Sequence, residues 1–224
     1  MQEEMPREAR LRHAMVQASL ELDARGLNRG TSGNLGVRCG ERLLVTPSGV
    51  PAPDLTAQGM VLLAANGDII GGGHPSSEWR FHRDILRSRP DVHAVVHVHS
   101  PFATTLACLG VEIPPFHYMI AAAGGDTIRC APYALFGTQE LSDHALAALQ
   151  DRRACLLANH GMIATGRDLA HALALCVEVE SLCEQYWRAR QIAEPRHLSN
   201  AQMAEVMEKF RTYGPQAAGE QTTP

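Results

Sequence analysis

Two histidines in the segment Val95-Val96-His97-Val98-His99 are spaced to act together. The valines favour a β-strand, and side chains two positions apart on a strand project from the same face. The ring nitrogens of His97 and His99 can therefore converge on one metal ion, for which imidazole is a common ligand. Paired histidines at a strand end also make ordinary hydrogen bonds, so the segment alone leaves both interpretations open.

Two further residues strengthen the metal interpretation. His160 follows the apolar run 156–158, and the end of a buried strand would place its side chain in a cleft. Glu78 follows a glycine-rich loop at the start of a predicted helix, where the helix dipole favours a carboxylate in any case. Three histidines and one glutamate would complete a tetrahedral zinc site in which one ligand can give way to a substrate. The candidate ligands are Glu78, His97, His99 and His160.

Three short segments could bind phosphate, namely residues 31–34, 46–49 and 76–77. Each combines a hydroxyl or amide side chain with glycine or with a helix start. Such loops expose backbone N–H groups, and Ser76-Ser77 would face an anion from the positive end of a helix. Each segment alone is typical of a plain turn. Together, and next to the candidate carboxylate ligand, they fit a phosphorylated substrate bound beside a metal.

The composition is that of a globular protein of one domain. The chain has 224 residues, of which 45% are hydrophobic and 20% charged, with a net charge of −4. This balance gives no electrostatic indication of nucleic-acid or membrane binding. No cysteine forms a C-x-x-C pair, and neither a signal peptide nor a long apolar run is present, so we expect a reduced, cytoplasmic protein.

Helical and strand-like segments alternate along the chain without a long linker or an internal repeat. Helices are predicted over 6–25, 78–89, 101–109, 140–150, 169–193 and 200–210, and strands over 34–38, 42–46, 60–65, 69–70, 92–98, 128–130 and 154–158. This alternation indicates one α/β or α+β domain, a sheet with helices on its faces. His82, on the apolar side of the second predicted helix, is interpreted as a surface or packing residue.

Several motifs give the chain a resemblance to the class II aldolase/adducin family. They are Gly30-Thr-Ser-Gly-Asn-Leu, Val45-Thr-Pro-Ser-Gly-Val, His74-Pro-Ser-Ser-Glu, Val96-His-Val-His-Ser, Phe116-His-Tyr-Met-Ile-Ala-Ala-Ala-Gly-Gly, Asn159-His-Gly and Lys209-Phe-Arg-Thr-Tyr-Gly. They occur in the order of the family and cover the chain up to Gly214, so together they are far more specific than any one motif.

The resemblance implies a fold and an assembly. The family fold is a three-layer α/β/α sandwich around a mainly antiparallel central sheet, here expected over residues 1–214, with 215–224 as a disordered tail. The resemblance also implies C4 homotetramers with sites between subunits.

The resemblance assigns site residues as well. One Zn²⁺ per subunit would be held by Glu78, His97, His99 and His160, and the substrate phosphate by Gly33, Asn34, Ser48, Gly49, Ser76 and Ser77. Tyr118 would reach the site of a neighbouring subunit, and Tyr213 would close over the site from the C-terminus. Phe136 matches a position near the aldehyde side.

The implied reaction is reversible cleavage of a ketose 1-phosphate to dihydroxyacetone phosphate and an aldehyde. Zinc would act as a Lewis acid that stabilises the enediolate formed when the C3–C4 bond breaks. Glu78 would protonate that enediolate, and Tyr118 would handle the proton of the C4 hydroxyl. A Schiff-base route needs a buried lysine, and the single lysine, Lys209, lies among charged residues near the C-terminus.

The aldehyde end of the substrate decides between several activities. L-Fuculose 1-phosphate is the first expectation, and 5-deoxyribulose or 5-methylthioribulose 1-phosphate on the same site is the alternative. Ribulose-phosphate 4-epimerase is a weaker alternative, because its additional aspartate and C-terminal histidine are not evident here. A non-catalytic, adducin-like interaction module is a third, and the presence of all four candidate ligands argues against it.

Overall fold

An eight-stranded sheet lies at the centre of the computed structural model, which describes residues 6–211. The strands are β1 (Asn34–Cys39), β2 (Arg42–Val45), β3 (Val61–Leu63), β4 (Ile69–Gly71), β5 (Ala94–Val98), β6 (Cys130–Ala131), β7 (Ala154–Leu157) and β8 (Gly161–Gly166). Their order in the sheet is β4-β3-β2-β1-β5-β8-β7-β6. Every neighbouring pair is antiparallel except β6 and β7. The expectation of a mainly antiparallel sheet is confirmed.

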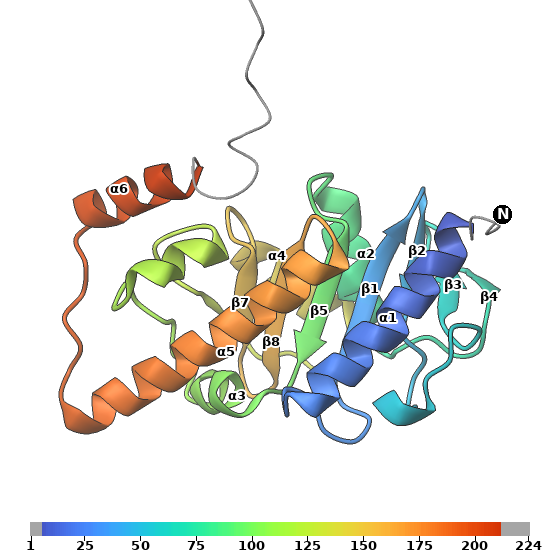
Figure 1. The fold of residues 1–224 in the computed structure, drawn as a ribbon, viewed down its shortest axis with the longest axis horizontal. Coiled ribbons are helices and arrows are strands. Elements are labelled where there is room, and N and C mark those ends of the chain that lie inside the picture. The colour runs from blue at the N-terminus through green and yellow to red at the C-terminus, as the bar shows by residue number, and fades with distance from the viewer. Residues whose placement is uncertain (1–5, 212–224) are drawn as a thin grey trace, which may run out of the picture.

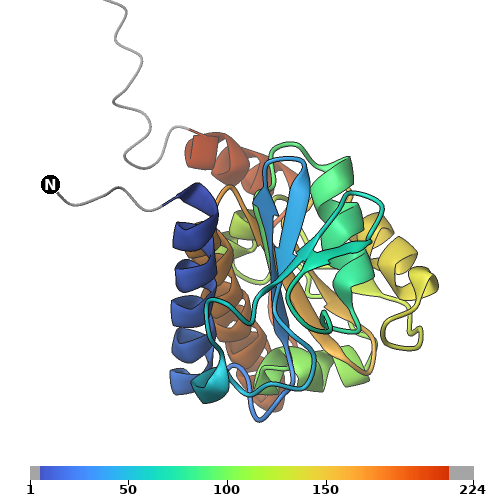
Figure 2. The same ribbon diagram turned by 90° about the vertical axis from the view of Figure 1, so that its right-hand side faces the viewer.

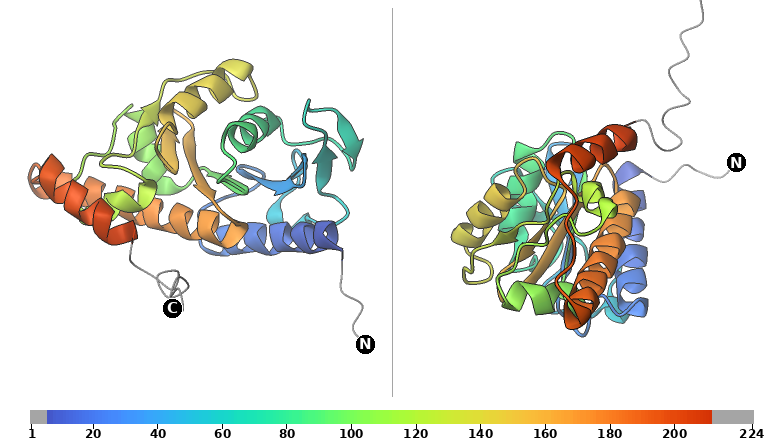
Figure 3. Two further views of the ribbon diagram at one scale, coloured as in Figure 1. Left: turned by 90° about the horizontal axis from the view of Figure 1, so that it is seen from above. Right: turned by 90° about the vertical axis from the view of Figure 1, so that its left-hand side faces the viewer.

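Helices cover both faces of this sheet. They are α1 (Arg7–Ala24), α2 (Trp79–Ser88), α3 (Pro101–Cys108), α4 (Gln139–Ala148), α5 (Leu169–Ile192) and α6 (Asn200–Arg211), with short 3₁₀ turns η1 (Ala52–Asp54) and η2 (Tyr118–Ala123). The long helices α1 and α5 cross one face (Figure 1). Helices α2 and α4 lie on the opposite face, so the sheet is the middle of three layers (Figures 2 and 3). The three-layer expectation is therefore also confirmed.

The alternation of side chains along β5 divides the core into two halves. Val96 and Val98 belong to the core under α1, α3 and α5, whereas Val95 belongs to the core under α2 and α4. Because His97 shares a face with Val95, its ring points toward α2 and lies 5.4 Å, between ring centroids, from Phe81. The candidate ligand strand is thus buried on both faces, and His97 itself has no exposed surface.

The sequence-based predictions missed one strand and displaced another. Residues 161–166 form β8, which lies between β5 and β7 and was not predicted. Its core segment, residues 162–165, is short and bounded by glycines, so it offers too few positions for a periodic pattern. The strand predicted over 128–130 is shifted, because Ile128 forms an isolated bridge with Ile113 and β6 begins at Cys130.

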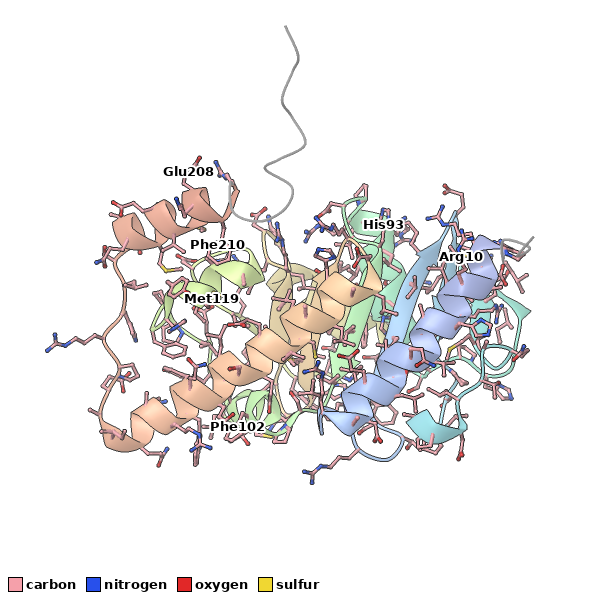
Figure 4. The ribbon with its side chains drawn as sticks, in the orientation of Figure 1. Arg10, His93, Phe102, Met119, Glu208 and Phe210 are labelled. Carbon is pink, nitrogen blue, oxygen red and sulfur yellow. The ribbon has the colours of Figure 1, made fainter. Side chains whose placement is uncertain are left out.

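Helix α6 lies at the end of the molecule farthest from α1 (Figure 1). Met203 of α6 is buried, and Phe210 of α6 packs against the same core as Met119 of η2. Figure 4 labels these last two side chains on their elements. Within the described residues, no helix has both the length and the apolar character needed to span a membrane.

A carboxylate on α5 fixes the helix that follows the ligand strand. Glu180 accepts hydrogen bonds from the Ser100 hydroxyl (2.6 Å) and from the backbone N–H groups of Phe102 (2.8 Å) and Ala103 (2.9 Å). These donors belong to the first turn of α3, which has no other side-chain cap at its N-cap residue, Ser100. Glu180 therefore ties the end of β5 to the long helix.

Replacing Glu180 by alanine is expected to lower the free energy of unfolding by about 2 kcal/mol, because three donors lose a charged acceptor. Urea denaturation at pH 7 measures the change. The matched control is Glu184→Ala one turn further along α5, where Glu184 pairs with Arg188 at the surface, and a change of at most about 0.5 kcal/mol is expected. Equal losses in the two variants would contradict the capping role.

Candidate metal centre and substrate cavity

Four titratable side chains converge at one end of β5. They are Glu78, His97, His99 and His160, and their donor atoms all lie within 4.8 Å of one another. The Nε2 atom of His97 lies 2.9 Å from Nε2 of His99 and 3.2 Å from Oε2 of Glu78. The Nε2 atom of His160 lies 3.3 Å from Oε1 of Glu78. The structure thus brings together the four residues that the sequence predicted as metal ligands.

Each ligand comes from the end of a regular element. His97 is the penultimate residue of β5, His99 follows its last residue, and Glu78 immediately precedes α2. His160 lies in the tight turn between β7 and β8, which corrects the expectation that it ends a longer strand. The preceding residue, Asn159, makes this turn with a positive φ of 56°, a conformation that asparagine tolerates.

Gly161 allows the ligands to approach one another. A Cβ atom at this position would lie 2.4 Å from the carbonyl oxygen of Val98 and 3.0 Å from Cδ2 of His99. A side chain there would push the β7–β8 turn away from the end of β5. The motif Asn159-His160-Gly161 therefore combines a turn, a ligand and the space that the neighbouring ligand needs.

The hydrogen bonds around the cluster fit a bound metal ion. The Nδ1 atom of His97 lies 2.9 Å from the carbonyl oxygen of Met162, which can only accept, so Nδ1 carries a proton and, in the neutral ring that binds a metal, Nε2 presents a lone pair to the cluster. Oε1 of Glu78 is buried and has no hydrogen-bond partner among the described residues. A divalent cation would satisfy both the lone pair and the carboxylate oxygen.

The protonation states are also those that metal binding requires. Burial alone would raise the pKa of Glu78, but attraction to His97 and a hydrogen bond with it outweigh burial and hold that pKa well below its usual range. Burial lowers the pKa values of His99 and His160 to about 4. At neutral pH the carboxylate is therefore ionised and these two imidazoles are neutral, as metal ligands must be.

The same shifts predict how the metal-free protein responds to acid. Burial lowers the pKa of His82 to about 3 and those of His99 and His160 to about 4, compared with 6.5 for an ordinary histidine. Between pH 6.5 and about 4 the unfolded chain binds more protons than the folded chain, so the free energy of unfolding falls as the pH falls.

Urea denaturation in the presence of a chelator should show this loss as a falling midpoint. Carboxylates with lowered pKa values, such as Glu78 and Asp84, add to this loss of stability only when the pH falls below their unfolded pKa values of about 4. A midpoint that stays constant from pH 6.5 to pH 4.5 would contradict the prediction.

A cavity of about 340 Å³ opens beside the cluster. Its lining includes three of the four candidate ligands, namely Glu78, His99 and His160, while His97 lies behind them. All six residues predicted to bind phosphate line it: Gly33, Asn34, Ser48, Gly49, Ser76 and Ser77. They come from the start of β1 and the residue before it, the loop after β2 and the residues that precede α2.

Backbone hydrogen bonds hold two of these loops side by side. The N–H group of Ser48 donates to the carbonyl of His74 (3.0 Å), and that of Ser76 donates to the carbonyl of Thr46 (2.9 Å). Ser76 and Ser77 also lie next to the N-terminus of α2, where the helix dipole favours an anion. The cavity therefore offers hydroxyl groups and a helix N-terminus within one wall.

The side chain of Asn34 links the Glu78 carboxylate to His82. Its Nδ2 atom donates to Oε2 of Glu78 (2.9 Å), and its Oδ1 atom lies 2.6 Å from Nε2 of His82. Both ends of the carboxamide are thus engaged with buried neighbours. His82, which the sequence indicated as a surface or packing residue, has no exposed surface and belongs to this hydrogen-bonded group.

The outer part of the cavity contains apolar and aromatic residues. Phe136, which the sequence placed near the aldehyde side, lines it together with Ala134 and Tyr133, and the latter was not predicted. Tyr133 lies in the loop between β6 and α4 and carries no motif that could have identified it. Phe136 and Tyr133 are about 60% exposed, so this rim is open to a substrate.

One predicted residue, Tyr118, does not join the cavity in this chain. Tyr118 is on η2, is 51% exposed and is not part of the cavity wall. Tyr213 and the expected tail lie outside the described residues.

The chain is similar in sequence to known aldolases, in agreement with the cluster of candidate metal ligands. Residues 13–187 match the family model described as the class II aldolase and adducin N-terminal domain. The chain is 59% identical over 207 residues to the 5-methylthioribulose-1-phosphate/5-deoxyribulose-1-phosphate aldolase of Rhodospirillum rubrum, covering 92% of this chain and 94% of the relative. It is 47% identical over 206 residues to the L-fuculose phosphate aldolase of Escherichia coli K12, covering 92% and 96%.

A solved structure of L-fuculose 1-phosphate aldolase superposes with a TM-score of 0.88 at 36% identity, over 90% of this chain and 96% of that one. Sequence and fold therefore agree over nearly the whole length of these aldolases. The Glu and His cluster adds the ligands that a metal-dependent aldolase requires. This chain belongs to the class II aldolase/adducin family and is a class II aldolase.

Proposed function

We propose that this enzyme uses zinc to cleave 5-methylthioribulose 1-phosphate and 5-deoxyribulose 1-phosphate to dihydroxyacetone phosphate and a short aldehyde. The observation that carries the reaction is the cluster of three imidazoles and one carboxylate beside a cavity rich in hydroxyl groups. The substrate differs from the first expectation, L-fuculose 1-phosphate. The identity of 59% to an aldolase of the former substrates, compared with 47% to a fuculose phosphate aldolase, favours the alternative.

The rim of the cavity supports this choice of substrate. L-Fuculose 1-phosphate releases an aldehyde with a hydroxyl group beside the carbonyl, whereas the two ribulose derivatives release aldehydes that carry only hydrogen or a methylthio group there. Ala134 and Phe136 add apolar surface to the wall of the same cavity. An apolar substituent gains contact with such a surface, whereas a hydroxyl group gains little from it.

Binding begins with the phosphate. Ser48, Ser76 and Ser77 can donate hydroxyl hydrogen bonds to it, and the N-terminus of α2 adds a favourable dipole. The phosphate then fixes the sugar so that its carbonyl and adjacent hydroxyl oxygens lie toward the metal centre. Orienting the reacting bond in this way lowers the entropic part of the barrier.

Zinc held by Glu78, His97, His99 and His160 would supply a Lewis acid that stabilises the negative charge developing as the C3–C4 bond breaks. Glu78 is the proposed proton carrier. Its Oε2 atom is fixed by Asn34, and its Oε1 atom has no hydrogen-bond partner among the described residues. The ionised Glu78 can therefore remove a proton from C3 of the three-carbon fragment in the synthetic direction, and once it has taken a proton from solvent it can return one to C3 in cleavage.

Tyr118 is our proposal for the second proton transfer, at the C4 hydroxyl group. Because it is exposed on η2 and away from the cavity of its own chain, it would act in the cavity of a neighbouring subunit of a homotetramer. Tyr213 would cover the cavity from the C-terminal segment.

Steady-state kinetics with three ketose 1-phosphates test the substrate proposal. The zinc-loaded enzyme is given 5-methylthioribulose, 5-deoxyribulose or L-fuculose 1-phosphate, and release of dihydroxyacetone phosphate is followed by coupled reduction. We expect kcat/KM for the first two to exceed that for L-fuculose 1-phosphate by about tenfold or more. A higher kcat/KM for L-fuculose 1-phosphate would contradict the proposal and favour that substrate instead.

A further inference from the structure

A buried chain of hydrogen bonds leads from α2 through β1 to the proposed proton carrier. His82 lies on α2, four residues after Glu78, and its Nε2 atom is 2.6 Å from Oδ1 of Asn34. Nδ2 of Asn34 is 2.9 Å from Oε2 of Glu78. His82 has no exposed surface, and Asn34 and Glu78 are 8% and 6% exposed, so water does not compete for these bonds.

The chemistry of the three groups fixes the direction of this chain. The ionised carboxylate of Glu78 can only accept, so Asn34 must present its NH₂ group to Glu78 and its carbonyl oxygen to His82. That carbonyl oxygen can also only accept, so Nε2 of His82 must carry the proton. If the Asn34 amide were turned over while Nε2 of His82 keeps its proton, both hydrogen bonds would be lost. His82 therefore holds Asn34 in the one orientation that serves Glu78.

The packing around His82 is specific for a flat ring. A Cβ atom at Gly36 on β1 would lie 2.5 Å from Nδ1 of His82 and 2.6 Å from its Cγ, so the ring occupies space that a glycine provides. The ring also contacts Phe81, with 4.5 Å between centroids. Nδ1 has no hydrogen-bond partner among the described residues, which costs about 1–3 kcal/mol in a buried site. An apolar side chain would avoid that cost, so a histidine here points to a task other than packing.

This chain becomes more important once a metal occupies the site. The other neighbours of the Glu78 carboxylate are Nε2 of His97 and Nε2 of His160, at 3.2 and 3.3 Å. A nitrogen whose lone pair binds a metal carries no proton and cannot donate to Glu78. Asn34 is then the one side-chain donor that the described residues give to this carboxylate. The orientation of Glu78 therefore depends on Asn34, and that of Asn34 depends on His82.

We propose that His82 is a positioning residue for Glu78, acting through Asn34 to keep the carboxylate aimed at the carbon that gains or loses the proton. The inference rests on the proposed function, because it takes Glu78 to be the proton carrier. His82 itself touches neither substrate nor metal. Its removal should slow proton transfer and leave substrate and metal binding in place.

Two substitutions at this position separate positioning from packing. His82→Leu fills the space without a donor, whereas His82→Gln can place an amide N–H near the position of the ring Nε2–H. The readouts are zinc content, kcat and KM for cleavage, and the exchange of solvent deuterium into the hydroxymethyl carbon of dihydroxyacetone phosphate. Exchange reports the proton transfer without the aldehyde. Circular dichroism verifies that each variant is folded.

We expect His82→Leu to bind zinc as the wild type does, and to lose about 10- to 100-fold in both the exchange rate and kcat, with KM changed less than about threefold. His82→Gln should recover most of that loss. A leucine variant that exchanges at the wild-type rate would overturn the proposal. So would a leucine variant that unfolds or loses zinc, or a glutamine variant as slow as leucine, because His82 would then be structural. If the wild type itself does not exchange deuterium, the proposed function fails instead.

Discussion

Glu78→Gln is expected to lower the rate of proton exchange at dihydroxyacetone phosphate, and the kcat of cleavage, by about 1000-fold or more. Glutamine has nearly the shape of glutamate and keeps a carbonyl oxygen for the metal, but it cannot carry a proton. The buried Oε1 atom, which has no hydrogen-bond partner among the described residues, is the atom whose basicity is lost. Deuterium incorporation followed by NMR measures exchange directly.

Metal content separates a missing base from a missing metal in this experiment. The variant and the wild type are compared at matched zinc occupancy, after incubation with excess zinc and gel filtration. The control variant is Glu140→Gln, an exposed carboxylate in the first turn of α4 on the same side of the sheet, for which wild-type rates are expected. Retained exchange in a zinc-loaded Glu78→Gln enzyme would exclude Glu78 as the proton carrier.

His97→Ala is expected to abolish both zinc binding and cleavage. His97 is the most deeply buried of the three histidines, and its lone pair is directed into the cluster by the hydrogen bond from Nδ1 to Met162. Loss of one of three imidazole ligands leaves too few donors for stable zinc binding. We expect zinc to fall below about a tenth of an equivalent and kcat by about 1000-fold or more, since the metal supplies the main charge stabilisation.

The matched control lies on the same segment of chain. His93, labelled in Figure 4, is exposed, precedes β5 and lies at the opposite end of that strand from the cluster. His93→Ala should keep both zinc and activity. Because the alanine at position 97 also leaves the Met162 carbonyl without its donor, thermal unfolding is recorded for both variants. A folded His97→Ala protein with full zinc content would contradict the ligand assignment.

The sequence could predict the ligand strand because the alternation of residue types within that segment is enough to indicate it. Alternating valines and histidines indicate a buried strand with both imidazoles at one end, and β5 has this form. His160 was also predicted as a ligand, although it lies in a turn and not at the end of a long strand. The difference has a physical cause, since β8 starts directly after His160 and pairs not only with its sequence neighbour β7 but also, non-locally, with β5.

The role of His82 could not be predicted from the sequence. Its helical spacing relative to Leu86 is the same whether the ring packs or donates a hydrogen bond. Only the register that places Asn34 opposite His97, and the space left by Gly36, bring the His82 ring to the amide of Asn34. The residues of the rim, such as Tyr133, likewise come together through loops that carry no periodic pattern.

The substrate could not be ranked from the sequence either. The residues expected to bind phosphate and metal are common to the rival substrates, so the difference lies at the aldehyde end. There, the proposed apolar contacts of Phe136 and its neighbours would differ by only about 1–3 kcal/mol between related substrates. Similarity to proteins with named substrates supplied the ranking that the residues alone could not.

The most direct test of a metal-dependent aldolase at this site is a zinc titration of the chelator-treated enzyme. Release of dihydroxyacetone phosphate from 5-methylthioribulose 1-phosphate is measured as zinc is added back. We predict almost no activity without metal, and a rise that ends at about one equivalent of zinc per chain. Full activity in the metal-free enzyme, or bound zinc without release of dihydroxyacetone phosphate from any of the three ketose 1-phosphates, would contradict the account.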